Sequence, residues 1–178
     1  EAREIISSNT PLPLRNEDSH DTLGTYQLVS SIEKMNQVPV SGEELIHLLQ
    51  TRHKTLLSAR ESKNPGQFKI KSNRAGTTHF VEPDLVRGTL LKSFEFYRAL
   101  DQPFAKAAYM MFCISEIHPF TDGNGRIARV MMNAELVVGK QSKIIIPTVY
   151  RDDYMGALKK VSKQGDMSTY IRMLQRAH

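Results

Sequence analysis

Cysteine is nearly absent from this sequence, and long apolar runs are missing. Cys113 is the single cysteine among 178 residues, which excludes an internal disulfide and a cysteine-based zinc site. It lies in the apolar run 110–114, where we expect a small buried core residue. The longest apolar candidate, around 144–146, stops at Pro147, far short of the roughly twenty residues that cross a bilayer. We therefore expect no membrane association.

Blocks of like charge and low-complexity runs are absent as well. The 24 basic residues are scattered among 19 acidic ones, for a net charge of +5. Nucleic-acid binders typically show a basic stripe with interleaved aromatic residues, so nucleic acid is not the expected partner. No signal peptide is visible, which favours a cytoplasmic location. The sequence starts at Glu1 rather than Met, which leaves room for an upstream segment.

The composition is that of a folded domain. Hydrophobic residues make up 40% of the chain, and its length suits one domain with a full apolar core. Residues 1–20 are polar and contain Pro11 and Pro13, which predicts an irregular lead-in with at most one short helix. We expect residues 21–178 to form the domain.

Apolar residues recur at helical spacing along most of this domain. The pattern starts at Asp21, and Ser41 followed by Glu44 predicts a capping box that opens a helix over 45–57. Further helices are predicted from Pro83 through Tyr97, from about Pro103 through Ile114, from Gly123 or Asn124 to near Gly139, over 152–163 and over 168–175.

The stretch 64–83 has a different pattern. Phe68 and Ile70 alternate with polar residues, a turn-rich segment follows at 72–76, and β-forming residues return at 77–81. This arrangement is typical of a β-hairpin, although the tight Asn-Gly turn is missing. The predicted fold is therefore mainly α, a helical bundle with one β-hairpin.

A polar, glycine-rich loop at 117–126 separates two of these helices, and packing alone does not require it. Gly123 and Gly125 at a helix start allow close approach of a ligand, and the free N–H groups and positive end of that helix attract an anion. Arg126 and Arg129 are three apart, hence on one face of the helix, where we expect them to reach neighbouring phosphate oxygens.

Two more side chains complete a set suited to phosphoryl or nucleotidyl transfer. Asp122 precedes the helix and is suited to hold Mg²⁺, a hard cation that prefers carboxylate and phosphate oxygens. His118 is suited to take a proton from an attacking hydroxyl. Each residue alone has an ordinary interpretation, with His118 as a loop residue, Asp122 as an N-cap and the arginines as partners of surface carboxylates. Their co-occurrence within 118–129 favours the chemical interpretation.

Other motifs fit the same residues less well. Residues 123–128 match the glycine fingerprint of dinucleotide-binding proteins, but a helix-like segment precedes them and no βαβ alternation follows. A P-loop is excluded because no Gly-Lys-Ser/Thr follows a strand. His118 with Asp122 lacks the further ligands of a zinc site.

The run His118–Arg129 resembles the signature of the Fic domain family, His-Pro-Phe-x-Asp/Glu-Gly-Asn-Gly/Lys-Arg-x-x-Arg, and every specified position is matched. The likeness covers about 23–174, because residues 66–83 resemble the family's hairpin flap and Tyr154 with Gly165-Asp166 resembles its C-terminal helices. The resemblance implies a mainly helical protein adenylyltransferase, which transfers AMP from ATP to a tyrosine, threonine or serine hydroxyl of a target protein.

The resemblance also implies a role for individual residues. His118 would deprotonate the target side chain, Asp122 would hold Mg²⁺, Gly123, Asn124 and Gly125 would form an anion nest, Arg126 and Arg129 would hold the ATP phosphates, and Tyr154 would lie near the adenine. The flap residues Thr77, Thr78 and His79 would align the target protein by β-strand addition. Ser162 departs from the pattern, because many members carry asparagine near this position.

Three other activities stay open at this point. Members with lysine at the position of Gly125 transfer the γ-phosphate, so a phosphotransferase is one alternative, and removal of AMP by water is another. A peptide-binding module that uses the flap is the third, but it would need neither His118 nor the arginines. Many members carry an inhibitory glutamate followed by glycine or asparagine, and no glutamate here has such a neighbour. We therefore expect restraint from an upstream segment or an inhibitory partner, or no restraint.

Overall fold

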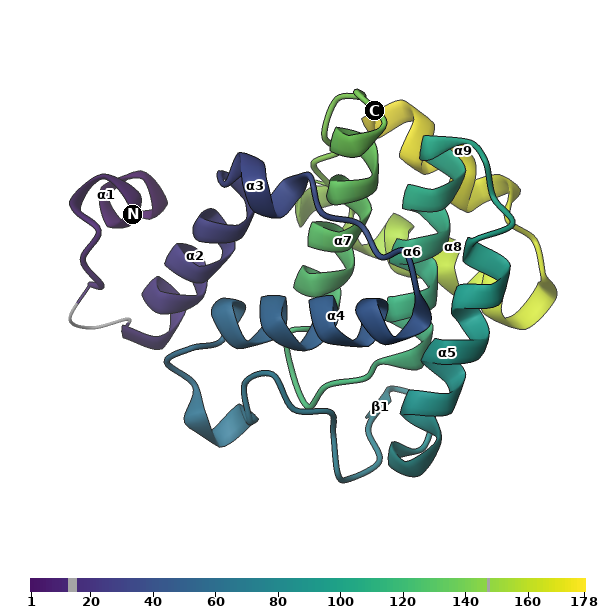
Figure 1. The fold of residues 1–178 in the computed structure, drawn as a ribbon, viewed down its shortest axis with the longest axis horizontal. Coiled ribbons are helices and arrows are strands. Elements are labelled where there is room, and N and C mark those ends of the chain that lie inside the picture. Colours follow the sequence, from purple (N-terminus) through teal and green to yellow (C-terminus); the bar gives the residue numbers. More distant parts are fainter. Residues whose placement is uncertain (13–15, 147) are drawn as a thin grey trace.

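The structure is a computed structural model that describes residues 1–12, 16–146 and 148–178. Pro13 and Pro147, named above, lie outside the described residues. The α-helices, in chain order, are α1 (Ala2–Ser8), α2 (Asn16–Val29), α3 (Ile32–Met35), α4 (Gly42–Leu56), α5 (Val86–Tyr97), α6 (Pro103–Ile117), α7 (Asn124–Val138), α8 (Arg151–Gln164) and α9 (Ser168–Ala177) (Figure 1). Short 3₁₀ turns lie at Glu61–Lys63, Pro83–Leu85 and Thr148–Tyr150. A two-stranded antiparallel sheet pairs β1 (Arg74–Ala75) with β2 (Thr78–His79). The prediction of a mainly α fold with one hairpin is confirmed.

Helices α6 and α7 lie side by side at the centre of the molecule (Figure 1). Their facing sides are apolar and rich in methionine, with Met111 and Met131 each at most 1% exposed. Helix α9 is tied to this pair because the buried Tyr170 hydroxyl donates to the Ala108 carbonyl at 2.9 Å. Cys113 is buried in α6, as expected for a small core residue.

The start of α4 confirms the predicted capping box. The Ser41 hydroxyl accepts a hydrogen bond from the Glu44 backbone N–H at 3.1 Å. The Glu44 carboxylate reaches back to the Val40 N–H at 2.8 Å, one residue earlier than the usual partner. Backbone donors at the helix start that have no intrahelical acceptor are thus satisfied by side chains.

The N-terminal region is more helical than predicted. The lead-in contains the short helix α1, as expected, but α2 begins at Asn16 instead of Asp21, so the last part of the predicted irregular segment is helix. Helix α2 ends at Val29, and Ser31 caps the separate helix α3 by accepting from the Lys34 N–H at 3.2 Å. An N-cap residue has an extended backbone, which interrupts the helix before it.

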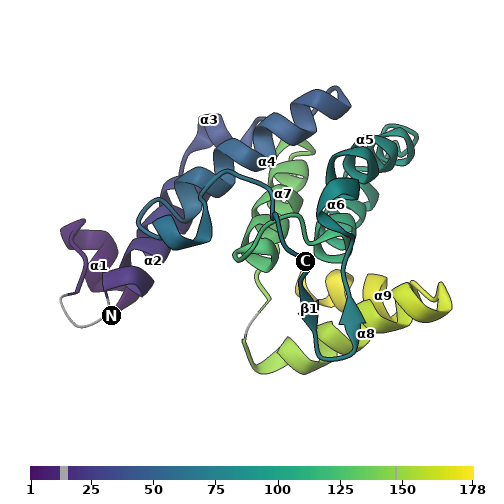
Figure 2. The same cartoon turned by 90° about the horizontal axis from the view of Figure 1, so that it is seen from below.

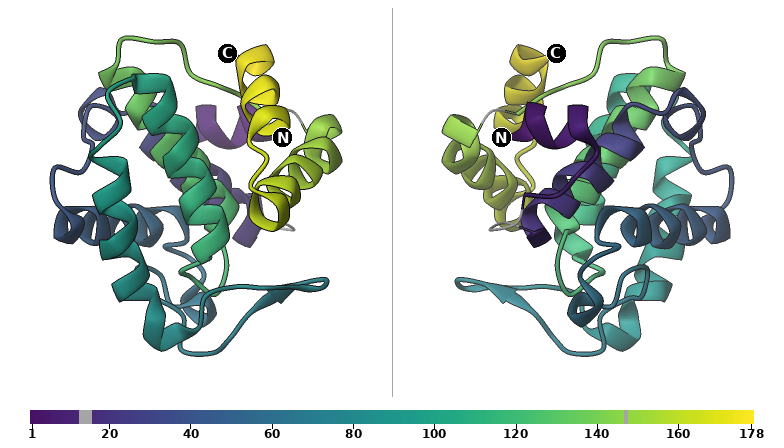
Figure 3. Two further views of the ribbon diagram at one scale, coloured as in Figure 1. Left: turned by 90° about the vertical axis from the view of Figure 1, so that its right-hand side faces the viewer. Right: turned by 90° about the vertical axis from the view of Figure 1, so that its left-hand side faces the viewer.

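The hairpin is shorter than predicted and turns at a different place. Gly76 has a φ of +59°, which glycine adopts without strain, and the turn forms at Gly76 and Thr77. Arg74 pairs with His79 and Ala75 with Thr78. The alternating segment around Phe68 is not a strand. Figures 2 and 3 show the hairpin as an arm that leaves the helical body beside α8.

A buried polar pair links α5 to α7. The Tyr97 hydroxyl lies 2.8 and 2.9 Å from the two carboxylate oxygens of Glu135, and the two residues are 4% and 3% exposed. Burial raises the pKa of Glu135 to about 7. Without the tyrosine hydroxyl this carboxyl group would lose its hydrogen-bond donor in the core.

We expect Tyr97→Phe to lower the free energy of unfolding by about 1 to 3 kcal/mol, the cost of leaving a buried polar group unsatisfied. Tyr26→Phe is the matched control, because Tyr26 is 43% exposed, and should change stability by less than about 0.5 kcal/mol. Urea unfolding followed by circular dichroism measures both values. Equal losses in the two variants would contradict a stabilising role for the pair.

Among the described residues, no helix combines the length and the apolar character needed to span a bilayer.

Candidate active site

A cavity of about 890 Å³ opens between the hairpin, the end of α6, the start of α7 and α8. Most of the predicted site residues lie on its wall, although they come from four separate parts of the sequence. The lining includes Thr77, Thr78, His79, His118, Gly125, Arg129 and Tyr154. Asp122, Gly123, Asn124 and Arg126 do not line it, although they belong to the same loop and helix start.

His118 ends α6 in a left-handed conformation, with φ of 52° and ψ of 57°. Its Nδ1 lies 3.2 Å from the Ser115 carbonyl. A carbonyl can only accept, so Nδ1 carries the hydrogen and Nε2 keeps a free lone pair. Burial lowers the pKa of His118, and the nearby Lys69 amine lowers it further. The imidazole is therefore neutral near pH 7, the form in which a base takes up a proton.

The hairpin contacts this imidazole directly. Phe80, which follows β2, stacks on the His118 ring with centroids 3.8 Å apart and planes 9° from parallel. Lys69 is 3% exposed and ties the same region to the loop, because its backbone N–H donates to the Pro119 carbonyl at 2.9 Å. Its amine donates to the Asn73 side chain at 2.7 Å. The base of the hairpin and the catalytic candidate thus form one packed unit.

The first turn of α7 has a backbone geometry that suits anion binding. Gly123 is the N-cap with φ of +76°, a conformation in which any other residue would be strained. Gly125 lies in the first turn and reaches the cavity wall. The first N–H groups of a helix have no intrahelical acceptor, and the helix dipole adds positive potential there. The Gly123 N–H already donates to the Asp122 carboxylate and the Arg126 N–H to the Gly123 carbonyl. An anion in the cavity at Gly125 would therefore meet the N–H groups of Asn124 and Gly125.

Asn124 has a structural role that the sequence did not reveal. Its side chain is buried, accepts from the Phe120 N–H at 2.8 Å and donates to the Phe120 carbonyl at 2.8 Å. Both hydrogen bonds cross the loop and fix its shape. The predicted contribution of Asn124 to an anion nest is limited to its backbone, because its side chain is turned into the protein.

Asp122 is the candidate cation ligand. Its side chain is 42% exposed, and one carboxylate oxygen accepts from the Gly123 N–H at 2.6 Å. Among the described residues no cluster of three or more potential metal-ligating side chains exists. Mg²⁺ commonly takes only one or two carboxylates and completes its shell with substrate phosphates and water. A single exposed carboxylate beside an anion site fits this pattern.

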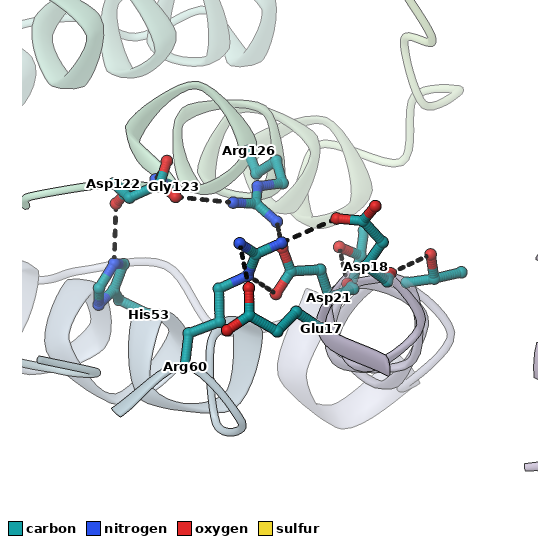
Figure 4. A network of polar contacts seen from close by, with 10 residues as sticks. Glu17, Asp18, Asp21, His53, Arg60, Asp122, Gly123 and Arg126 are labelled. Carbon is teal, nitrogen blue, oxygen red and sulfur yellow. Dashed lines mark hydrogen bonds and ion pairs between the residues drawn. The ribbon is translucent and has the colours of Figure 1, made fainter. Parts of the chain in front are cut away.

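The two motif arginines, both predicted to hold ATP phosphates, diverge in the structure. Arg129 lines the cavity and, among the described residues, is held by no ion pair. Arg126 turns away from the cavity and forms an ion pair with Asp21 of α2 (Figure 4). The two residues share a helix face, but the carboxylate that attracts Arg126 lies far away in the sequence.

Tyr154 lies on α8 within the cavity wall, as predicted. It is 6% exposed, and its hydroxyl lies 3.1 Å from the Ser115 hydroxyl, so α6 and α8 are joined beside His118. Ser162, two turns further along α8, also lines the cavity and donates to the Glu116 carboxylate at 2.6 Å.

His53 is a site residue that the sequence did not reveal. It lies on α4 with no exposed surface and stacks on Phe120, with ring centroids 3.7 Å apart and planes 3° from parallel. Its Nδ1 accepts from the Gly66 N–H at 2.9 Å, so Nε2 carries the hydrogen and donates to the Asp122 carbonyl at 3.0 Å. Its spacing with Leu49 and Leu56 places it on the apolar face of α4. A histidine at such a position is the sequence feature that could have indicated a buried, hydrogen-bonded residue.

The stability of the protein should depend on pH through His53. Burial lowers its pKa from 6.5 to about 4. Between these two pH values His53 binds a proton in the unfolded chain but not in the folded protein. The free energy of unfolding therefore falls as the pH falls through this window. The full effect is worth roughly 3 kcal/mol.

Urea unfolding of the wild type, His53→Gln and His47→Gln at pH 7.5, 6 and 5 tests this dependence. His47 is exposed on the same helix and serves as the matched control. We expect His53→Gln to lose the contribution of His53 to the pH dependence and His47→Gln to keep it. A His53→Gln curve parallel to that of the wild type would contradict the assignment.

A model of the Fic/DOC family matches residues 39–136, which include the loop and most of α7. The chain is 38% identical over 72 residues to protein adenylyltransferase Fic of Drosophila persimilis, covering 40% of this chain and 14% of the relative. It is 25% identical over 181 aligned positions to protein adenylyltransferase Fic of Culex quinquefasciatus, covering 98% of this chain and 35% of the relative. The chain thus spans about a third or less of the length of these relatives.

Solved structures share the fold. Fic-1 of C. elegans superposes with a TM-score of 0.78 at 22% identity, covering 99% of this chain and 53% of that one. A Fic-domain-containing signalling protein of Bacteroides thetaiotaomicron gives a TM-score of 0.76 at 18% identity, covering 90% and 68%.

Proposed function

The chain belongs to the Fic/DOC family, and from this premise we propose that it transfers AMP from ATP to a tyrosine, threonine or serine hydroxyl of a target protein. The observation that carries the proposal is the placement of three groups on one cavity. His118 offers a free Nε2 lone pair, Gly125 marks the anion-binding turn of α7, and Arg129 adds a cation. The names of relatives that are protein adenylyltransferases support it.

The proposed chemistry is an in-line displacement at the α-phosphate. Nε2 of His118 takes the proton of the target hydroxyl as its oxygen bonds to the α-phosphorus, and the bond to the bridging oxygen breaks to release pyrophosphate. The N–H groups of the α7 turn and Arg129 hold the phosphates in position and balance the charge of the transition state. Mg²⁺, held by Asp122, would neutralise phosphate charge.

We place the target protein at the hairpin. Its strands are short, and Thr77, Thr78 and His79 reach the cavity wall. An extended segment of a partner can pair with the edge of such a hairpin through backbone hydrogen bonds, which depend little on the sequence of that segment. Because Phe80 stacks on His118, a target strand bound to the hairpin would bring its hydroxyl close to the base.

Labelled nucleotides test the reaction. The protein is incubated with lysate and ATP carrying a label on either the α- or the γ-phosphate, with wild type, His118→Ala and the exposed control His47→Ala. We expect the α label on protein with wild type and His47→Ala. With His118→Ala we expect at least a roughly 100-fold loss, typical of removing a general base. Transfer of the γ label alone would identify a phosphotransferase. Undiminished transfer of the α label by His118→Ala would contradict the assignment of His118 as the general base.

The pH dependence of transfer gives a further check. His118 has a lowered pKa because it is buried, so activity should persist below pH 6.5, where an ordinary imidazole becomes protonated, and fall only at lower pH. Initial rates from pH 5 to 8 measure this. A loss of activity already above pH 6.5 would contradict the assignment.

A further inference from the structure

Arg126 is held on the side of α7 that faces α2, away from the cavity. Its Nη1 is paired with the Asp21 carboxylate, and its Nη2 lies 3.8 Å from the Asp122 carboxylate (Figure 4). Arg126 is absent from the cavity wall on which Arg129 lies. The guanidinium of Arg126 thus already has the carboxylates of Asp21 and Asp122 as neighbours.

Asp21 is a buried carboxylate with two cationic partners. It is 7% exposed, and besides Arg126 it accepts from Arg60, whose Nε lies 3.0 Å from Oδ1 and whose Nη2 lies 2.8 Å from Oδ2. The hydrogen bond to Asp21 raises the pKa of Arg60. A buried carboxylate needs such pairing, because removal of one partner leaves charge in a poorly solvated place. Glu17 and Asp18 extend the network, but they are exposed and contribute little.

The backbone of α2 is fixed where it carries Asp21. Gly24 lies one turn further on the same face, and a Cβ atom there would lie 2.6 Å from the Thr55 carbonyl oxygen and 2.7 Å from that of Leu56. Helix α2 therefore touches the last turn of α4 directly. Helix α4 also carries His53, which binds the Asp122 carbonyl. The start of α7 is thus held from two sides, at Asp122 and at Arg126.

We propose that Asp21 is a positioning residue for the reaction: it holds Arg126 and so fixes the first turn of α7, while phosphate recognition rests on Arg129 and the backbone of that turn. This inference rests on the proposed function and deepens it, because it assigns different tasks to the two motif arginines. Arg126 does not contact the nucleotide, and its effect on catalysis passes through the orientation of the helix start.

Two measurements separate the tasks of the arginines. The first is the Kd of the protein for a non-hydrolysable ATP analogue in the presence of Mg²⁺, measured by calorimetry. The second is the kcat of AMP transfer. Arg129→Met should raise the Kd tenfold or more. Arg126→Met and Asp21→Asn should leave the Kd within threefold of wild type and lower kcat by roughly ten- to a hundredfold, the effect of a small misplacement. Arg126→Lys should recover part of kcat, because lysine can still pair with Asp21.

The double variant Asp21→Asn/Arg126→Met tests whether the residues act as one unit. We expect its kcat to lie within about twofold of either single variant, because the effects of substitutions at two residues in contact are not additive. A Kd raised as much by Arg126→Met as by Arg129→Met would overturn the proposal and make Arg126 a phosphate ligand. Tighter binding by Asp21→Asn would also overturn it, since a freed Arg126 would then reach the nucleotide.

Circular dichroism at the assay temperature checks that each variant is folded. Should Arg126→Met fail to fold, Arg126→Lys, which keeps the positive charge, and Asp21→Asn, which keeps the side-chain size, carry the same comparison of Kd with kcat. The binding measurement needs no turnover, so it decides the role of Arg126 even if the wild type transfers no AMP. Absence of AMP transfer by the wild type would contradict the proposed function alone.

Discussion

The hydrogen bond from His53 to the Asp122 carbonyl is the contact on which the geometry of the site depends. It joins α4 to the loop between α6 and α7, and the other ring nitrogen of His53 accepts from Gly66 at the base of the hairpin. One neutral imidazole therefore fixes three segments that are distant in sequence. Because a neutral imidazole has one donor and one acceptor, protonation would remove the acceptor that Gly66 needs. Burial against Phe120 keeps the ring neutral.

The different surroundings of Arg126 and Arg129 follow from where carboxylates are buried. Asp21 needs cationic partners because it is nearly inaccessible to water, and Arg126 supplies one from the first turn of α7. Arg129 meets no such carboxylate among the described residues and keeps its charge for the cavity. A helix start can thus hold one arginine for structure and, one turn later, another for a ligand.

The sequence predicted the helices well because their periodicity and caps are local properties. The start of α4 follows from Ser41 and Glu44, and the start of α7 from Gly123. The motif also grouped His118, Gly125 and Arg129, which line one cavity in the structure. The ion pair of Arg126 with Asp21 could not be predicted, since Asp21 is 105 positions away and no local pattern reports such a contact.

The same limit explains His53 and the hairpin. His53 reads as one more residue of the apolar face of α4, and only the folded chain shows that its ring nitrogens face Gly66 and Asp122. The strands were predicted too long because β-forming residues continue through Val81, whereas pairing is set by the turn at Gly76. Side-chain preference alone does not fix strand length, because pairing depends on context.

If the target protein docks at the hairpin as proposed, the contact between the hairpin and His118 would direct a hydroxyl of the target to that imidazole. Phe80 belongs to the hairpin and lies flat on the imidazole, while Lys69 anchors the hairpin's first arm to the loop through the Pro119 carbonyl. A strand added to this hairpin would have a fixed position relative to His118, because the ring of Phe80 and the segment that carries Lys69 connect the hairpin to the His118 loop. Because backbone pairing spaces residues regularly, the register of the added strand selects which side chain lies beside Nε2. In the proposed arrangement, target choice would depend on the register of the added strand and on access to the cavity, with no need for a deep pocket for each side chain.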